Sequence, residues 1–328
     1  MDSPLTDRSV LCTGATGSFG HAFVRRALAD GVHRIVVFSR DELKQAQMKA
    51  EFPDPRVRWF IGDVRDRDRL LQAMSGVQLV VHAAAMKRVE ACEADPWEAT
   101  LTNVVGTHHV ATAAIMAGVD RAVMLSTDKA PAAHTLYGAT KFAAERLWIA
   151  SNVYAAGHPT RLSATRYGNV LGSRGSVLGL FRSQRDAGLP LSLTCESATR
   201  FWMTIEQAVD LVLLAFRNMR GGEVYVPKIG SASVLDLARA VVGPQLYEPG
   251  HIETGLRPGE RLHETLISSD EARTTYDAGT HYVIEPEAVT WRAPSSTSLP
   301  RVAPDFAYRS DTNGRQLSVD ELRALVAA

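Results

Sequence analysis

A tyrosine and a lysine four positions apart, preceded by an acidic and a basic residue, form the most reactive combination of side chains in this chain. The segment from Ser126 to Lys141 reads STDKAPAAHTLYGATK. Positions four apart share a helix face, so Tyr137 and Lys141 could point into one cavity. A nearby ammonium group favours the phenolate and lowers the pKa of the tyrosine, which would suit it to take a proton from a sugar hydroxyl. Asp128 and Lys129 add an acid and a base that alcohol oxidation alone does not need.

Chance spacing on a surface helix is the competing interpretation of Tyr137 and Lys141, and a glycine-rich turn upstream argues against it. The stretch TGATGSFG, from Thr13 to Gly20, follows one apolar run and opens an amphipathic segment. Its glycines permit a tight turn, close approach of the backbone to a pyrophosphate, and close helix packing. The turn predicts a dinucleotide site. Its expected contacts are Gly14, Thr16, Gly17, Ser18, Phe19 and Gly20.

The residues that follow the second apolar run indicate which dinucleotide binds. This run ends VVFSRDELK, and its end should meet the adenosine ribose. Cationic side chains at this place accommodate a 2′-phosphate, whereas an acidic one binds the 2′-hydroxyl of NAD. Ser39, Arg40 and Lys44 therefore favour NADP, and Asp41 keeps NAD open as an alternative.

Further cofactor contacts are expected after the third and fourth apolar runs. Asp63 is placed to receive the adenine amino group with Val64 behind the ring, although Asp63 could also cap the next helix. The small side chains of Ala83, Ala84 and Ala85 would let a ribose and pyrophosphate lie against the backbone. Asn103, inside a long helix, is a candidate for support of the site or for a backbone hydrogen bond.

Apolar runs alternate with amphipathic stretches through the first half of the chain. Such alternation, with glycine-rich turns, predicts a Rossmann-type, doubly wound parallel α/β sheet. Beyond about residue 165 the alternation loosens, so we expect an NADP-binding domain over 1–165 and a smaller substrate-binding lobe over 166–328, with the chain crossing between them. The expected strands cover 9–14, 34–40, 57–63, 79–85, 122–128 and 161–172, the expected helices 21–31, 67–76, 99–118, 137–157 and 205–219, and a Pro- and Ser-rich surface loop 284–304.

The amino-acid composition limits the classes of partner that the chain is expected to bind. The 328 residues include 36 Lys plus Arg and 36 Asp plus Glu, and this zero formal charge argues against a nucleic-acid or polybasic membrane partner. No stretch reaches the roughly 18 apolar residues that span a bilayer. Cys12, Cys92 and Cys195 are scattered without metal-ligand spacing, which fits reduced thiols and no metal site. The expected setting is soluble and cytoplasmic.

The motifs together resemble a known family. TGATGSFG, HAAA, TNVVG, Tyr-x-x-x-Lys and RYGNV are similar to the extended short-chain dehydrogenase/reductases, most of which act on nucleotide sugars. SRDELKQ, AAAMKRVE, STDKA with LYGATK, RYGNVLGSRGSV, TRFWMT, VPKIGS, LRPGERLHE and YRSDTN resemble the inverting UDP-N-acetylglucosamine 4,6-dehydratases more narrowly, through nearly the whole chain.

The resemblance implies a lyase mechanism. Tyr137 would deprotonate the 4-hydroxyl while the cofactor takes a hydride from carbon 4, and Thr127 would bond the 4-oxygen. Lys129, as a neutral amine of depressed pKa, would remove the proton from carbon 5, while Asp128 protonates the departing 6-hydroxyl. Hydride would then return to carbon 6, so no net oxidation occurs. Lys141 supports Tyr137 and could depress the pKa of Lys129.

The resemblance also implies contacts to the nucleotide-sugar substrate. Arginine suits bidentate phosphate binding, although a loop arginine is commonly a solvated surface charge. Arg257 is favoured over Arg200, and Lys228 is a weaker candidate. The implied substrate contacts are Lys87, Asn169, Ser173, Arg200, Arg257 and Glu260.

Two departures from the family pattern border the expected sugar pocket. PAAHT stands where the family carries Asn-Pro, and Lys87 is followed by Arg88 where the family has histidine. His134 could supply a polar contact in the altered loop or face solvent. An epimerase of the same fold, which needs Tyr137 and Lys141 only, and a non-catalytic nucleotide sensor remain alternatives. The long helices containing Asn103 and Lys141 commonly form a four-helix interface in the family, which implies a homo-oligomer.

Overall fold

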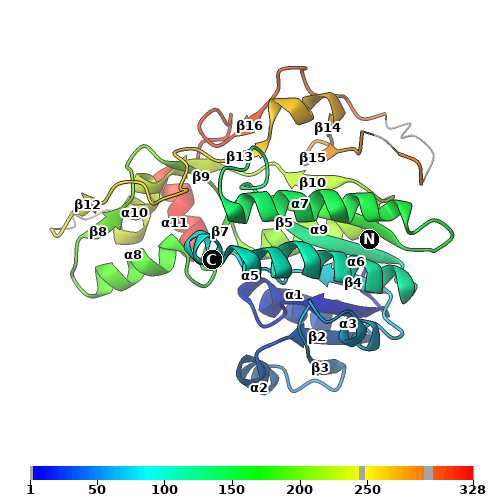
Figure 1. The fold of residues 1–328 in the computed structure, drawn as a ribbon. Helices are drawn as coiled ribbons and strands as arrows, with labels where there is room; N and C mark the ends of the chain where they lie inside the picture. Colours follow the sequence, from blue (N-terminus) through cyan, green and yellow to red (C-terminus); the bar gives the residue numbers. More distant parts are fainter. Residues whose placement is uncertain (1–2, 244–247, 288, 292–297, 328) are drawn as a thin grey trace.

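A nine-stranded sheet forms the centre of the protein, whose computed structural model describes residues 3–243, 248–287, 289–291 and 298–327 (Figure 1). The strands from β10 to β3 are parallel, and β15 and β14 add an antiparallel edge. The predicted doubly wound parallel sheet is confirmed. The order across it is β14 (Thr275–Asp277), β15 (His281–Ile284), β10 (Val224–Pro227), β6 (Arg161–Tyr167), β5 (Arg121–Thr127), β4 (Leu79–His82), β1 (Ser9–Thr13), β2 (Arg34–Ser39) and β3 (Val57–Ile61).

Helices cover both faces of this sheet, which explains why its strands read as unbroken apolar runs. Successive side chains of β1 enter opposite cores: Val10 and Cys12 pack in one, and Leu11 packs in the other. The first core lies under α1 (Ser18–Ala29), α2 (Glu42–Glu51) and α9 (Ile205–Asn218), and the second under α3 (Arg67–Ala73), α6 (Gly106–Met116) and α7 (Leu136–Ala150). The sequence did not predict α2, because only two of its ten residues, Gln45 and Met48, are buried.

The predicted helix over 99–118 is the later part of a longer helical stretch that begins at residue 96. Pro96 occupies the first turn, and Asp95 caps it by accepting the Glu98 N–H at 3.2 Å. The stretch consists of α5 (Pro96–Thr100), a π-helix (Leu101–Val105) and α6, and α4 (Val89–Ala94) precedes it. A π-helical turn commonly marks a functional position, and this one carries Asn103.

A smaller lobe with its own apolar core lies to one side of the sheet, at the left of Figure 1. The chain leaves the main sheet at Gly168, where an added Cβ would lie 2.5 Å from the Cβ of Phe201. It later returns, since β10, β14 and β15 complete the main sheet. The lobe contains α8 (Val177–Asp186), α10 (Val234–Val242), α11 (Val319–Ala327) and the sheet β11 (Ser231–Ser233), β9 (Thr199–Met203), β7 (Asn169–Val170), with the pair β12 (His251–Glu253) and β8 (Leu191–Leu193).

A final antiparallel pair and two 3-10 turns complete the elements. β13 (Thr265–Ile267) pairs with β16 (Tyr308–Arg309), and 3-10 turns cover Ser151–Val153 and Ser269–Thr274. In the predicted loop 284–304, residue 284 ends β15, and residues 288 and 292–297 lie outside the described residues. None of the helices in the described part of the chain is long and apolar enough to cross a membrane.

Candidate active site

The glycine turn between β1 and α1 leaves no room for side chains. Gly14 has φ +65°, and a Cβ there would lie 2.7 Å from the backbone nitrogen of Ala84. A Cβ at Gly20 would lie 2.0 Å from the carbonyl oxygen of Ala15. The turn lies where strand order reverses between β1 and β4, the crevice in which such sheets bind ligands. This bare backbone at a helix N-terminus fits the pyrophosphate of a dinucleotide.

A basic side chain from the second lobe lies over this turn. The Arg174 N–H donates to the Ser18 hydroxyl at 3.1 Å, and its guanidinium donates to the Thr16 carbonyl at 3.2 Å. Lys87 in turn donates to the Arg174 carbonyl at 3.4 Å. Burial, together with the positive charge of Arg174, lowers the pKa of Lys87. Sequence reasoning did not single out Arg174, which is 158 positions from Thr16.

The residues expected around the adenosine form a cluster of charges. Arg40 is half exposed and lies 3.6 Å from Asp63, whose carboxylate also accepts hydrogen bonds from the backbone N–H and the guanidinium of Arg65. Asp63 does not cap the next helix, because Asp66 accepts the Arg69 N–H there. Lys44 pairs with Asp41 at 2.6 Å. The Ser39 hydroxyl is buried and accepts from Gln45.

The backbone that follows β4, just before Lys87, is hydrogen-bonded to the π-helix. Asn103 accepts the Met86 N–H at 2.8 Å and donates to the Met86 carbonyl and to Thr140. Its amide therefore holds the backbone next to Ala83–Ala85 instead of reaching outward. Val64 is buried in the core beneath Gly106.

The predicted acid and base meet at the end of β5. The Thr127 hydroxyl donates to Asp128 at 2.9 Å, and the Lys129 ammonium donates to the same carboxylate at 3.1 Å. The first turn of α7 lies directly on this pair, because a Cβ at Gly138 would lie 2.4 Å from the Lys129 carbonyl oxygen. Thr135 caps that turn by accepting the Gly138 N–H. Tyr137 and Lys141, both buried, follow on α7.

The electrostatics differ from two sequence expectations. Burial raises the pKa of Tyr137 to about 12. The positive charge of Lys129 acts in the opposite direction but does not outweigh burial. Burial lowers the pKa of Lys129, but the carboxylates of Asp128 and Glu264 outweigh it, so the pKa is raised instead of depressed. Lys141 shows the depressed pKa instead: burial lowers it to about 8, and its amine donates to the Leu125 carbonyl at 2.7 Å.

A second carboxylate, which the sequence did not reveal, completes this group. Glu264 is 2% exposed and accepts from the Lys129 ammonium at 3.0 Å. Arg200 also lies beside Glu264, because its Nε is 3.5 Å from the same Glu264 oxygen. The Nη2 of Arg200 donates to Glu260 at 2.8 Å. Among the described residues, the second oxygens of Asp128 and Glu264 have no hydrogen-bond partner. The only sequence signal for Glu264 is a carboxylate directly before the short apolar strand β13.

The chain matches the polysaccharide biosynthesis protein family over residues 10–286. The chain belongs to this family. It is 42% identical to the inverting UDP-N-acetylglucosamine 4,6-dehydratase of Campylobacter jejuni serotype O:2, with 97% of each chain covered. It is 40% identical to a UDP-glucose 4-epimerase of Rickettsia canadensis, covering 85% of this chain and 83% of that protein. The X-ray structure of Pen from Bacillus thuringiensis superposes with a TM-score of 0.89 at 35% identity and 98% coverage of both chains. The resemblance to extended short-chain dehydrogenase/reductases is confirmed.

The remaining predicted substrate residues are spread over several parts of the structure. Arg257 is exposed and lies 3.6 Å from Glu90, while its backbone N–H donates to Glu260. Lys228 pairs with Asp277 at 2.6 Å. Asn169 lies on β7 in the three-stranded sheet, and the Ser173 N–H donates to Val170 in the turn before Arg174.

The loop that departs from the family pattern is held by an arginine. Arg261 donates to His134 Nδ1 at 2.8 Å and to the carbonyls of Pro131 and Ala132. His134 makes this polar contact and is also exposed to solvent, so both sequence interpretations hold. Ala132 has φ +51°, a strained value for a residue with a side chain.

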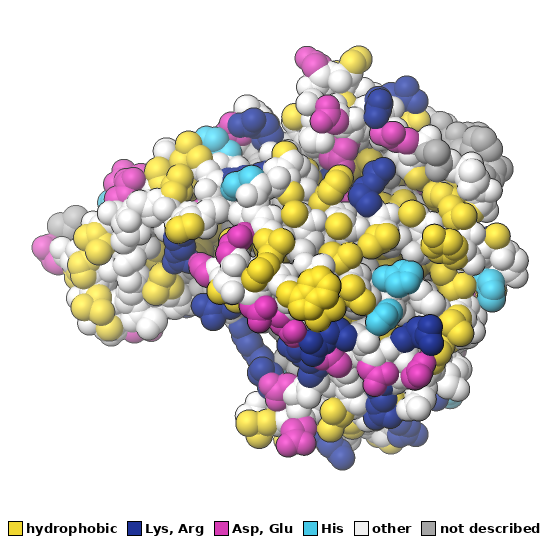
Figure 2. Space-filling view, viewed as in Figure 1, with side chains coloured by type: hydrophobic (Ala, Val, Ile, Leu, Met, Phe, Trp, Pro, Cys, Tyr) yellow, Lys and Arg dark blue, Asp and Glu magenta, His cyan; other side chains and the backbone are white. Residues whose placement is uncertain are grey.

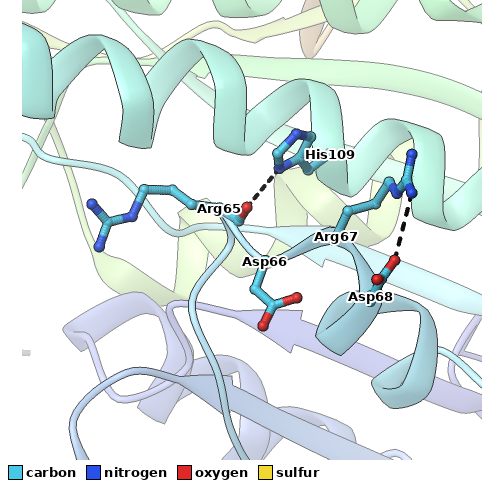
Figure 3. A pocket seen from close by; sticks show the side chains of 5 residues that line it. All are labelled: Arg65, Asp66, Arg67, Asp68 and His109. Atoms are coloured by element: carbon cyan, nitrogen blue, oxygen red, sulfur yellow. Dashed lines mark hydrogen bonds and ion pairs between the residues drawn. The ribbon is translucent and has the colours of Figure 1, made fainter.

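The molecular surface is hollowed between the part that carries α8 and β12 and the part that carries α2 and β3 (Figure 2). Lys and Arg side chains gather along the margin of this hollow. A different hollow lies between the start of α3 and α6, where the His109 Nδ1–H donates to the Arg65 carbonyl and Arg67 faces Asp68 (Figure 3). Its lining contains none of the predicted catalytic residues.

Proposed function

We propose that this protein is a nucleotide-sugar 4,6-dehydratase that acts on UDP-N-acetylglucosamine or a close relative with NADP as cofactor. The observation that carries the proposal is the contact of Asp128 and Lys129 beneath the first turn of α7, which adds an acid/base pair of a buried aspartate and a partly buried lysine to Tyr137 and Lys141. Elimination of water needs an acid and a base at neighbouring carbons, whereas oxidation or epimerisation at one carbon does not. The 42% identity to the Campylobacter jejuni dehydratase supports this function.

Each group in the site takes a distinct step. Tyr137, in its phenolate form, accepts the proton of the 4-hydroxyl, which Thr127 positions. A bound nicotinamide cofactor would supply the hydride acceptor for carbon 4 and then the hydride donor for carbon 6, and its oxidised form would add a positive charge that favours the phenolate. Asp128 is the acid for the departing 6-hydroxyl, and burial together with the negative charge of Glu264 raises its pKa, which favours the protonated form. Lys129 is the base for the proton on carbon 5 once its own proton has passed to Asp128 along their 3.1 Å hydrogen bond.

The cofactor preference rests on Arg40, whose half-exposed guanidinium can turn from Asp63 to a 2′-phosphate. Arg40→Ser should weaken NADP binding about 10-fold, the loss of roughly one charge-assisted hydrogen bond, and leave NAD binding unchanged. Fluorescence titration with both cofactors measures this. Equal weakening of both would remove the case for NADP.

One incubation tests the reaction. Pure protein with NADP and UDP-N-acetylglucosamine in deuterated water should lose the 6-hydroxyl and gain deuterium at carbon 5. Inversion at carbon 4 without isotope incorporation would instead support an epimerase, the activity named for the 40% identical Rickettsia canadensis protein. No reaction with any of several UDP-hexoses would favour a non-catalytic nucleotide sensor.

We also propose a homo-oligomer and a cytoplasmic setting. Large apolar side chains are exposed along the outer helices: Trp97 of α5, Met116 of α6, and Phe142 and Leu147 of α7. A second copy would cover such a face. Sedimentation should show at least a dimer, and Phe142→Glu should shift it toward the monomer. The three free thiols, Cys12, Cys92 and Cys195, are suited to a reducing compartment.

A further inference from the structure

Glu264 occupies an unusual position beside the proposed acid and base. Its side chain is 2% exposed, and one oxygen accepts from the Lys129 ammonium at 3.0 Å. The same ammonium also donates to Asp128 at 3.1 Å. One lysine is thus held between two buried carboxylates, each of which has one oxygen without a partner among the described residues. A buried polar atom without a partner needs a physical reason.

The backbone of Glu264 is held as firmly as its side chain. Its N–H donates to the Ser310 hydroxyl at 2.9 Å, and the Ser310 N–H donates to its carbonyl. The Ser310 hydroxyl also contacts Thr199, which precedes Arg200 on β9. Three segments far apart in the chain therefore converge to place this carboxylate against Lys129.

This arrangement has a consequence for catalysis. A lysine side chain has four rotatable bonds, and the Lys129 side chain is 30% exposed, so the two carboxylate contacts are what hold its ammonium in place. Displacement of a reacting group by about 1 Å can slow a reaction roughly 100-fold. The second contact, to Glu264, comes from outside the β5–α7 segment and is independent of Asp128.

We propose that Glu264 is a positioning residue for the acid/base pair: its carboxylate holds the Lys129 ammonium beside Asp128 and governs how protons are distributed among the three groups. This inference rests on the proposed dehydratase function and deepens it. Burial opposes the ionisation of Glu264, but the positive charges of Lys129 and Arg200, both near the same Glu264 oxygen, outweigh it and lower the pKa of Glu264. The charged and titratable groups that face Glu264 and Lys129 are Asp128, Tyr137, Arg200 and Arg261.

The direction of the expected pH effect follows from the signs of the charges. The negative charge of Glu264 raises the pKa values of both Asp128 and Lys129. Glu264→Gln removes the charge and keeps the shape, so both pKa values should fall. Because the reaction needs Asp128 protonated and Lys129 neutral, both limbs of the pH profile of kcat should move to lower pH.

The test compares Glu264→Gln with Glu223→Gln. Glu223 is equally buried, with a 2% exposed side chain, but precedes β10 at the opposite end of the sheet from the β5 terminus. Glu264→Gln should lower kcat for dehydration about 10- to 100-fold, leave KM within a few fold, and shift the pH profile down by about one unit. In Glu264→Gln, reduced cofactor should still form rapidly when substrate is added, because oxidation at carbon 4 uses Tyr137. Glu223→Gln should leave the profile in place.

A second readout does not depend on dehydration. Competitive acylation with acetic anhydride, followed by mass spectrometry, reports the reactivity of Lys129 against pH. Glu264→Gln should make Lys129 reactive at lower pH. Thermal unfolding and NADP binding check that Glu264→Gln folds. If it does not fold, Glu264→Asp replaces it, because this variant keeps the charge but shortens the side chain by one methylene. It should lower kcat without moving the pH profile.

The outcomes separate the two proposals. A folded Glu264→Gln variant with an unchanged pH profile and unchanged Lys129 reactivity overturns the role of Glu264, even if kcat falls. A wild-type protein that removes no water from UDP-N-acetylglucosamine overturns the proposed function instead. In that case the acylation experiment still decides whether Glu264 controls Lys129.

Discussion

Two clusters of charged side chains in this molecule have different proposed roles, one structural and one catalytic. One centres on Arg166 of β6, which is 1% exposed and donates to Glu145 of α7, to Glu271 and to the Leu266 carbonyl. The other centres on Lys129, between Asp128 and Glu264. Both join α7 or β5 to segments beyond residue 260.

The two clusters differ in how completely they are hydrogen-bonded. In the Arg166 cluster all four carboxylate oxygens accept a hydrogen bond from the arginine. In the Lys129 cluster one oxygen of each carboxylate has no partner within the described part of the chain. A fully satisfied network makes a rigid joint, whereas an incomplete one leaves capacity for a ligand or a transferred proton. Between these two clusters, the unsatisfied carboxylate oxygens, and not the charge, distinguish the proposed catalytic group.

The largest expected effect separates the clusters by activity. Lys129→Met should lower the rate of dehydration about 100- to 10,000-fold, the range of a lost general base, while cofactor binding stays intact. The deuterium assay and NADP titration measure the two quantities. Normal dehydration by this variant would show that another group takes the proton from carbon 5.

The second prediction separates them by stability. Arg166→Met leaves Glu145 and Glu271 buried without their cation, so the free energy of unfolding should fall by about 3–5 kcal/mol. Urea denaturation measures this. Arg67→Met, at an exposed pair with Asp68, is the control and should cost less than about 1 kcal/mol. A similarly small loss at Arg166 would mean that the cluster is not a structural joint.

The third prediction concerns Lys141, which lies on α7 one turn before Glu145. Burial lowers its pKa from 10.5 to about 8. Between these values the unfolded chain binds more protons, so stability rises with pH. The difference in free energy of unfolding between wild type and Lys141→Met should therefore increase by about 3 kcal/mol as pH rises from 8 to 10.5. A flat difference across this window would mean that Lys141 keeps its proton, as Lys129 does.

The local part of the site could be predicted from the sequence because its residues are neighbours in the chain. Glycines at 14, 17 and 20 act within one turn, and Asp128, Lys129, Tyr137 and Lys141 lie within one strand, loop and helix. Secondary structure alone brings these groups together, so their spacing was informative. The same holds for the alternating apolar runs that form the parallel sheet.

Contacts across large separations could not be predicted in this way. Glu264 meets Lys129 across 135 positions, and Arg174 meets Thr16 across 158. No periodicity or spacing links such pairs, because chain folding and not local geometry brings them together. The pKa directions of Tyr137 and Lys129 were wrong for the same reason: the sequence reveals a neighbouring charge but not the burial or the second carboxylate that outweighs it.

The amino-acid sequence by itself determined the cofactor turn, the parallel sheet and the four groups expected to react, since each depends on residue type at short range. Only the tertiary structure decided which of those groups hold protons and which are held rigid. Burial and long-range pairing set the free energy of a charge, and both arise when distant segments pack around it. Glu264 and the two unpartnered carboxylate oxygens are what that packing added.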